Sequence, residues 1–177
     1  HYRDLSEVPQ LMVRESASLP VTKCIYERLP YPTRSGGLEK AFIEWAQADS
    51  SVDAFCKISE NRHTFARLRY VKEDGLPAFY SPDFMVRANG CVYLTETKAQ
   101  QQTIHPNVQR KLKAASAWCE RINAATEEMD GALTWHYVML GEDAFRDWRE
   151  KGARLSELLD YARVWPVATA DAQQRLL

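Results

Sequence analysis

The dipeptide Asn89-Gly90 constrains the fold of this chain more than any other feature of its sequence. Asn-Gly readily supplies the two positive φ angles of a type I′ turn, and apolar-rich runs flank it on both sides. The sequence therefore predicts a two-residue β-hairpin in which Ala88 pairs with Cys91, and the rest of the register follows from that pair.

The same register places Asp83 opposite Glu96. Like charges directly opposed across a ladder, with Cβ atoms roughly 5 Å apart, repel each other unless a cation lies between them. Lys98 follows Glu96 by two residues and projects from the same face, because side chains alternate along a strand. A β-bulge would shift the pairing by one residue. The alternative is that Asp83 caps a turn after Pro82 while Glu96 and Lys98 line a solvent-facing strand.

Composition predicts a soluble, packed protein. With 177 residues, a 45% hydrophobic share and five tryptophans, the chain has enough apolar material for a core. We expect an extended lead-in over His1 to Pro20 and a single domain over residues 21–177. No apolar run reaches membrane-spanning length, so we expect no membrane partner. Isolated cysteines without CxxC spacing predict reduced thiols and a cytoplasmic location.

Hydrophobic periodicity predicts the order of the elements. Helices are expected where apolar residues recur at helical spacing or cluster near the end of the chain: Leu38 to Ala48, Val108 to Ala125, Phe145 to Trp148 and Leu155 to Tyr161. Strands outside the hairpin are expected over short alternating or apolar runs: Val21 to Glu27, Val52 to Ile58, Phe65 to Val71 and Trp135 to Leu140. Glu73-Asp74-Gly75 predicts a turn. This order predicts an α/β fold in which helices flank a mixed sheet.

Several segments around the hairpin resemble a known family. Pro82-Asp83, a turn and then Glu96-Thr97-Lys98 are similar to the PD-(D/E)xK signature of metal-dependent nucleases. More narrowly, YSPDF, YLTETK, KLKAASAWC and WHYVML together look like the C-terminal endonuclease domain of type III restriction enzymes, over roughly Leu38 to Leu140. The resemblance implies a restriction-endonuclease-like fold. It also implies that Asp83 and Glu96 bind Mg²⁺, with Mn²⁺ as a substitute, and that Lys98 assists the attacking water.

The chemistry of phosphodiester hydrolysis fits these residue types. A bound magnesium ion offsets charge in the transition state and makes hydroxide available near neutral pH, and a few carboxylate oxygens recruit it. The resemblance implies that the backbone carbonyl of Thr97 is a further ligand. An acid on the first helix is common in such nucleases, and Glu39 is the matching position. An equally good interpretation is that Glu39 is a first-turn glutamate that the helix dipole favours.

Candidate substrate contacts lie on two other segments. Gln109, Lys111 and Lys113 open the long helix, and Arg67 and Arg69 alternate with apolar residues, so that they point away from the core. Both groups are also consistent with solvated faces. The net charge of −1 gives no overall basic signature, so any affinity for nucleic acid must come from local patches.

Together these features predict a magnesium-dependent DNA endonuclease domain, the nuclease module of a type III-like restriction enzyme. The sequence contains no P-loop, so ATP-driven translocation would come from a helicase or translocase region of the same chain or of a partner chain. Two alternatives remain: a DNA repair or junction nuclease of the same fold, and a catalytically inactive module for nucleic-acid binding or assembly.

Overall fold

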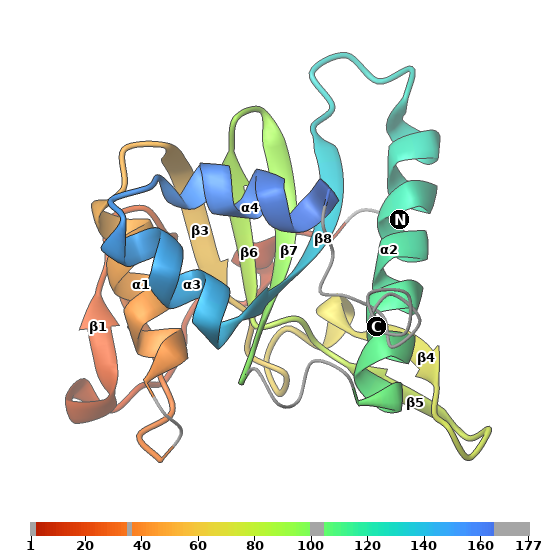
Figure 1. The fold of residues 1–177 in the computed structure, drawn as a ribbon, viewed down its shortest axis with the longest axis horizontal. Coiled ribbons are helices and arrows are strands. Elements are labelled where there is room, and N and C mark those ends of the chain that lie inside the picture. Colours follow the sequence, from red (N-terminus) through yellow and green to blue (C-terminus); the bar gives the residue numbers. More distant parts are fainter. Residues whose placement is uncertain (1–2, 35–36, 100–104, 165–177) are drawn as a thin grey trace, which may run out of the picture.

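A mixed four-stranded sheet lies at the centre of the computed structural model, which describes residues 3–34, 37–99 and 105–164 (Figure 1). Its strands, in spatial order, are β3 (Val52–Lys57), β6 (Phe84–Ala88), β7 (Cys91–Lys98) and β8 (Thr134–Gly141). Strand β6 runs antiparallel to both β3 and β7, and β8 runs parallel to β7. The predicted mixed α/β architecture is confirmed.

The predicted hairpin is the centre of this sheet. Asn89 and Gly90 have φ angles of 51° and 72°, and Ala88 pairs with Cys91 as expected. The ladder runs without a bulge to the pair Phe84–Thr95, and the one irregularity on this side of the sheet falls between β3 and β6, at Val52/Ala54. The ladder therefore follows the predicted register as far as Phe84–Thr95, one pair short of the predicted opposition of Asp83 and Glu96.

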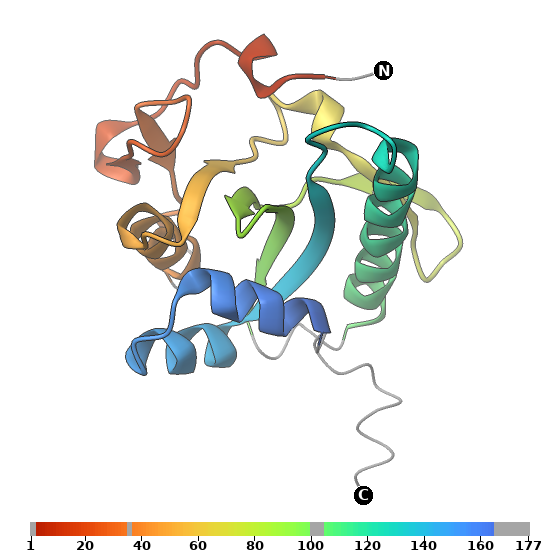
Figure 2. The ribbon, with the colours of Figure 1, turned by 90° about the horizontal axis from the view of Figure 1, so that it is seen from above.

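Helices cover both faces of the sheet (Figure 2). On one face, α1 (Leu38–Ala48), α3 (Glu142–Glu150) and α4 (Leu155–Val164) bury apolar side chains against alternate residues of β6, β7 and β8. On the other face, α2 (Pro106–Thr126) packs over Leu94, Tyr137 and Met139. The parallel pairing of β7 and β8 requires such a crossover, and α2 provides it. Of the helices that the structure describes, none has the length and apolarity to cross a membrane.

Most of the predicted elements are present. The first helix has the expected bounds, and its residues Phe42, Ile43, Trp45 and Ala46 are buried. The ring of Phe42 stacks on that of Phe84 with centroids 4.4 Å apart, which joins α1 to the sheet beside the hairpin's open end. The second helix, the final strand and the two short helices also form, each slightly longer than predicted.

The strand predicted over Val21 to Glu27 is wrong. This segment is a series of bends closed by a hydrogen bond from Val21 N–H to the Glu27 carbonyl, and the strands lie on either side of it. These are β1 (Ser18–Pro20) and β2 (Arg28–Pro30), which pair antiparallel. The alternating pattern belongs to a loop that buries Val21 and Tyr26 individually rather than one face of a strand.

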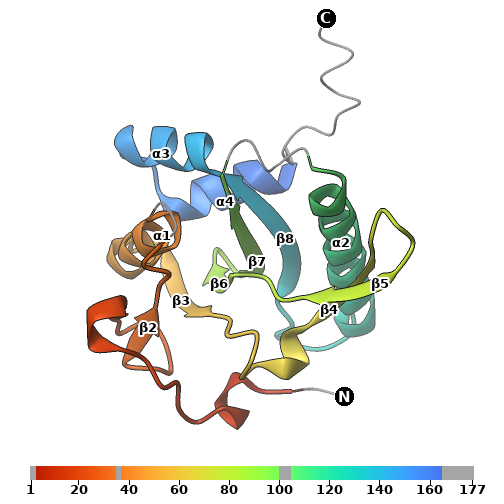
Figure 3. The same ribbon diagram turned by 90° about the horizontal axis from the view of Figure 1, so that it is seen from below.

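The strand predicted over Phe65 to Val71 forms only in its second half. Residues Thr64–Ala66 make a 3-10 turn, η3, and β4 (Leu68–Val71) pairs with an unpredicted strand, β5 (Pro77–Tyr80). The predicted turn joins them, with Gly75 at a φ angle of 82°. The β4–β5 hairpin is a separate sheet that packs against α2 (Figures 1 and 3).

The N-terminal segment is more structured than an extended lead-in. It contains two 3-10 turns, η1 (Leu5–Glu7) and η2 (Glu15–Ala17), as well as β1. Val8 is buried, and its carbonyl accepts a 2.8 Å hydrogen bond from the hydroxyl of Tyr26. The same hydroxyl lies 2.9 Å from Nε2 of His63, a fully buried histidine whose Nδ1 accepts the N–H of Ser59. These bonds attach the segment to the body of the protein. The four cysteines are free thiols.

Candidate active site

The candidate site lies where β7 ends and β6 begins. Here the structure brings together Asp83, Glu96, Thr97 and Lys98, the four residues that the sequence analysis placed at the open end of the hairpin. Strand β7 extends beyond the start of β6, so Glu96, Thr97 and Lys98 have no ladder partner on the β6 side. They remain fixed because β8 pairs with them along the opposite edge of β7.

Glu96 is the most unusual group at the site. Only 3% of the residue is exposed, and its Oε1 lies 2.6 Å from Nζ of Lys98. Its Oε2 is buried with no hydrogen-bond partner among the described residues. Burial raises the pKa of Glu96 to about 7, with a further contribution from the negative charge of Asp83, while Lys98 and Lys111 act in the opposite direction. A buried carboxylate oxygen without a partner is unfavourable for the fold, and among the four such side-chain atoms of the described residues this one alone belongs to a carboxylate.

Lys98 stays charged beside this carboxylate. Its side chain is 22% exposed, and burial by itself acts to lower its pKa. The charge of Glu96 and the hydrogen bond to it, followed by the charges of Asp83 and Glu39, raise the pKa of Lys98 above its usual value. The lysine is therefore an ammonium that is paired with Glu96, and the charges of two further carboxylates favour its protonated form.

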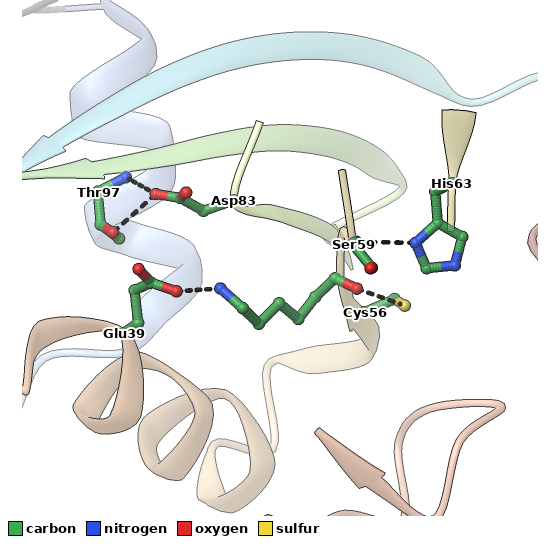
Figure 4. Close-up of polar contacts among 7 residues, drawn as sticks. Glu39, Cys56, Ser59, His63, Asp83 and Thr97 are labelled. Carbon is green, nitrogen blue, oxygen red and sulfur yellow. Dashed lines mark hydrogen bonds and ion pairs between the residues drawn. The ribbon is translucent and has the colours of Figure 1, made fainter. Parts of the chain in front are cut away.

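Asp83 reaches across to the neighbouring strand. Its Oδ2 accepts hydrogen bonds from both the backbone N–H and the hydroxyl of Thr97, each 2.8 Å long (Figure 4). The N–H and the carbonyl of one residue point to the same side of a β-strand. The carbonyl of Thr97 therefore points toward Asp83, past the start of β6, which is the position that the predicted ligand role requires.

Glu39 points from the first turn of α1 toward the sheet (Figure 4). It forms an ion pair with Lys57, and the two side chains are only 20% and 15% exposed. Glu39 is therefore turned inward and paired rather than solvated. Its charge also contributes to the raised pKa of Lys98.

Lys57 is a site residue that the sequence analysis missed. It ends β3, and its Nζ lies 5.0 Å from the centroid of the Phe84 ring. Side chains alternate along the strand VDAFCKI, so Lys57 lies on the same side as the buried Phe55. This position on the core side of the strand is the sequence signal that could have identified Lys57. Lys57 holds Glu39 about as Lys98 holds Glu96, so two acids and two lysines line this edge of the sheet.

Among the predicted substrate contacts, Lys111 lies nearest the site. Its Nζ sits over the rings of Tyr70 and Tyr80, 5.7 and 5.0 Å from their centroids, and its charge reaches Glu96. Gln109 and Lys113 are each two positions from Lys111 on α2, so they project in other directions. Gln109 is half-buried and Lys113 is exposed.

The two predicted arginines lie on another element. Arg69 belongs to β4 and Arg67 directly precedes it, and both are exposed. One guanidinium nitrogen of Arg67 donates to the carbonyl of Glu60 at 3.1 Å. The arginines therefore belong to the β4–β5 hairpin and not to the cluster of carboxylates itself.

The residues present fit a magnesium ion that shares its ligands with substrate. In the part of the chain that the structure describes, no three His, Cys, Asp or Glu side chains gather closely enough to hold a metal by themselves. Mg²⁺ commonly takes one or two carboxylates and completes its octahedron with water and substrate phosphate oxygens. Asp83, Glu96 and the carbonyl of Thr97 supply such a partial set, and the unpartnered Oε2 is an available ligand atom.

Comparison with known proteins adds no relative. No family model, no curated protein and no solved structure matches this chain.

Proposed function

We propose that this protein is a magnesium-dependent nuclease of restriction-endonuclease-like fold that hydrolyses DNA phosphodiester bonds. The observation that carries the proposal is the buried, unpartnered Oε2 of Glu96 beside Asp83 and Lys98. Burying this group is unfavourable for the fold, and a cation bound during function accounts for it. The strand, turn and strand that carry these residues, between α1 and α2, support the resemblance to the PD-(D/E)xK nucleases.

Each residue of the site has a distinct part in this proposal. Asp83, Glu96 and the carbonyl of Thr97 would hold Mg²⁺ or Mn²⁺, which when bound neutralises phosphate charge and favours hydroxide over water. Lys98 donates from Nζ to the attacking water and orients it toward phosphorus. Lys111, held by two tyrosine rings, places a positive charge for a phosphate oxygen of the cleaved strand.

The finer assignment is to the nuclease module of a type III-like restriction enzyme. It rests on the resemblance of YSPDF, YLTETK, KLKAASAWC and WHYVML, which form the connection from β5 to β6, the end of β7, the middle of α2 and β8. Under this assignment a helicase or translocase region, in the same chain or a partner, would deliver DNA to the site.

Plasmid cleavage tests the proposal. Supercoiled DNA is incubated with the protein in magnesium or in EDTA, and nicked and linear products are measured. We expect magnesium-dependent nicking that falls about 10²- to 10⁴-fold in Lys98→Ala, the usual range for the loss of a group that assists proton transfer. Lys151→Ala, which removes an exposed lysine at the end of α3, is the matched control and should retain full activity.

Two results would redirect the proposal. Retained cleavage by Lys98→Ala, with unchanged circular dichroism, would exclude a catalytic role for Lys98. If the wild type binds DNA but never cuts it in magnesium or manganese, the inactive binding module becomes the better assignment.

A further inference from the structure

The outer face of the β4–β5 hairpin carries an apolar and basic surface that the fold does not use. We define this face by Arg69, Val71, Pro77 and Phe79, in which the register sets Arg69 opposite Phe79 and Val71 opposite Pro77. Phe79 is 62% exposed and Val71 is 48% exposed. Phe79, Val71 and Pro77 share one face with Arg69, so they form a patch rather than single scattered apolar residues.

The inner face of the same hairpin is packed against α2. Leu68, Tyr70 and Tyr80 are buried against α2, the rings of the two tyrosines meet edge to face at 5.6 Å, and the Tyr80 hydroxyl donates to the Lys111 carbonyl at 3.0 Å. These contacts fix the hairpin on the helix that carries Lys111. The outer face is therefore held rigidly, although no other part of the described chain covers it.

The hairpin that carries this outer face connects directly to the candidate site. Figure 3 shows the chain passing from β5 directly into β6, and Asp83 is only four residues beyond Phe79. Four residues span at most about 14 Å of fully extended chain. A nucleic-acid strand whose phosphate reaches Asp83 and Glu96 has its neighbouring nucleotides within reach of Phe79.

The charges of the hairpin favour contact with a phosphate near Arg69 rather than at the tip. Arg69 has no hydrogen bond or ion pair with any residue that the structure describes, so its guanidinium is available to a phosphate. At the tip, Lys72 pairs with Asp74 at 3.4 Å, so Glu73 leaves a net negative charge that repels phosphates. A strand would therefore cross the hairpin near Arg69 and Phe79 and avoid the tip, where Leu76 is 57% exposed.

We infer that Phe79 and Arg69 bind an unpaired nucleotide next to the cleaved phosphate, with the base stacked on the Phe79 ring. Proteins that bind single-stranded nucleic acid combine an aromatic platform with nearby cations in this way. In an intact duplex the bases are already stacked on each other, so a platform of this kind favours DNA with unpaired bases near the cut. The inference rests on the proposed nuclease function and specifies its substrate class.

Binding to oligonucleotides that contain 2-aminopurine tests this inference without cleavage, because the titrations are run in EDTA. The probes are a blunt duplex and the same duplex with a short unpaired flap. We expect the wild type to bind the flap substrate more tightly and to change its 2-aminopurine fluorescence. Phe79→Ala should weaken flap binding about 5- to 150-fold, the range for loss of one base–aromatic stack, and should leave duplex binding unchanged.

Two further variants separate stacking from charge. Leu76→Ala, which removes a similarly exposed apolar side chain from the tip, should bind both probes like the wild type. Arg69→Ala should weaken both probes and reduce the salt dependence of binding by about one counterion. Equal wild-type affinity for the two probes, or no effect of Phe79→Ala, would overturn the inference.

Cleavage measured in parallel distinguishes this inference from the proposed function. If the wild type nicks plasmid in magnesium while Phe79→Ala binds the flap normally, the nuclease stands and the stacking surface fails. If flap binding depends on Phe79 but magnesium produces no cleavage, the surface stands and the nuclease assignment fails.

Discussion

Replacing Glu96 with glutamine should stabilise the metal-free protein above neutral pH. The substitution keeps the shape of the side chain and removes its buried negative charge. The structure gives the size of the effect, because burial and the charge of Asp83 raise the pKa of Glu96 from 4.5 to about 7. At about 1.4 kcal/mol per pKa unit, that interval corresponds to about 3 kcal/mol.

The sign follows from the protons bound in each state. A folded-state pKa above the unfolded value contributes stability that is fully present below pH 4.5 and is lost as pH rises to about 7. Wild type therefore weakens across this range, whereas Glu96→Gln does not. The ion pair with Lys98 forms only when Glu96 is ionised, and its attraction is already included in the pKa of about 7. The difference between the two pH values isolates the ionisation of Glu96.

Thermal unfolding in EDTA at constant ionic strength measures this difference. From pH 5 to pH 8, Glu96→Gln should gain about 2 to 3 kcal/mol over wild type, or roughly 5 to 10 °C in Tm for a protein of this size. Glu120→Gln, at an exposed glutamate of α2, is the control and should show no such gain. A gap between Glu96→Gln and wild type that is equal at pH 5 and pH 8 would refute the reasoning.

Three other predictions concern the metal, a buried histidine and the hairpin turn. Asp83→Asn should be more stable than wild type in EDTA by about 0.2 to 1 kcal/mol, because it relieves the repulsion from Glu96, and its Tm should be slightly higher. Magnesium should raise the Tm of wild type but not that of the variant. Equal magnesium-induced shifts in Tm would exclude Asp83 as a ligand. Tyr26→Phe should lower the free energy of unfolding in urea by about 1 to 3 kcal/mol, because it removes the hydroxyl that bridges His63 and the N-terminal segment. Burial lowers the pKa of His63 below its usual value of 6.5, so neutral His63 contributes stability above pH 6.5 that is lost as the pH falls below that value. Acid titration should therefore show a loss of stability below pH 6.5 in both wild type and Tyr26→Phe. Gly90→Ala, which puts a side chain at a φ angle of 72°, should cost about 1 to 2 kcal/mol in the same urea assay, and a smaller cost would mean that the turn relaxes.

The parts of this structure that the sequence predicts are those with a local signal. Asn89-Gly90 fixes the turn and, through the alternation of β6 and β7, the neighbourhood of Asp83, Glu96 and Lys98. Helix α1 was equally accessible, because Phe42 and its neighbours repeat at helical spacing. In these segments the residues that decide the conformation are close together in the chain.

The parts that sequence reasoning missed depend on distant contacts. Lys57 pairs with Glu39 eighteen residues away, and neither segment alone predicts that ion pair. The short strands β1, β2 and β5 have too few residues to show a period. The position of Lys111 depends on Tyr70 and Tyr80, which belong to a separate hairpin. Pattern reasoning identifies candidate residues here but not their partners.

The bend-rich segment Val21 to Glu27 has a consequence for self-association. Strand β3 forms one edge of the central sheet, and an exposed edge is a template on which strands of other molecules can add. Phe55 N–H on this edge donates to the Lys23 carbonyl at 2.9 Å, and Lys23 itself is tied by its Nζ to the Asp49 carbonyl. The loop thus occupies an amide of the β3 edge that an added strand would need, which makes pairing at this edge less favourable.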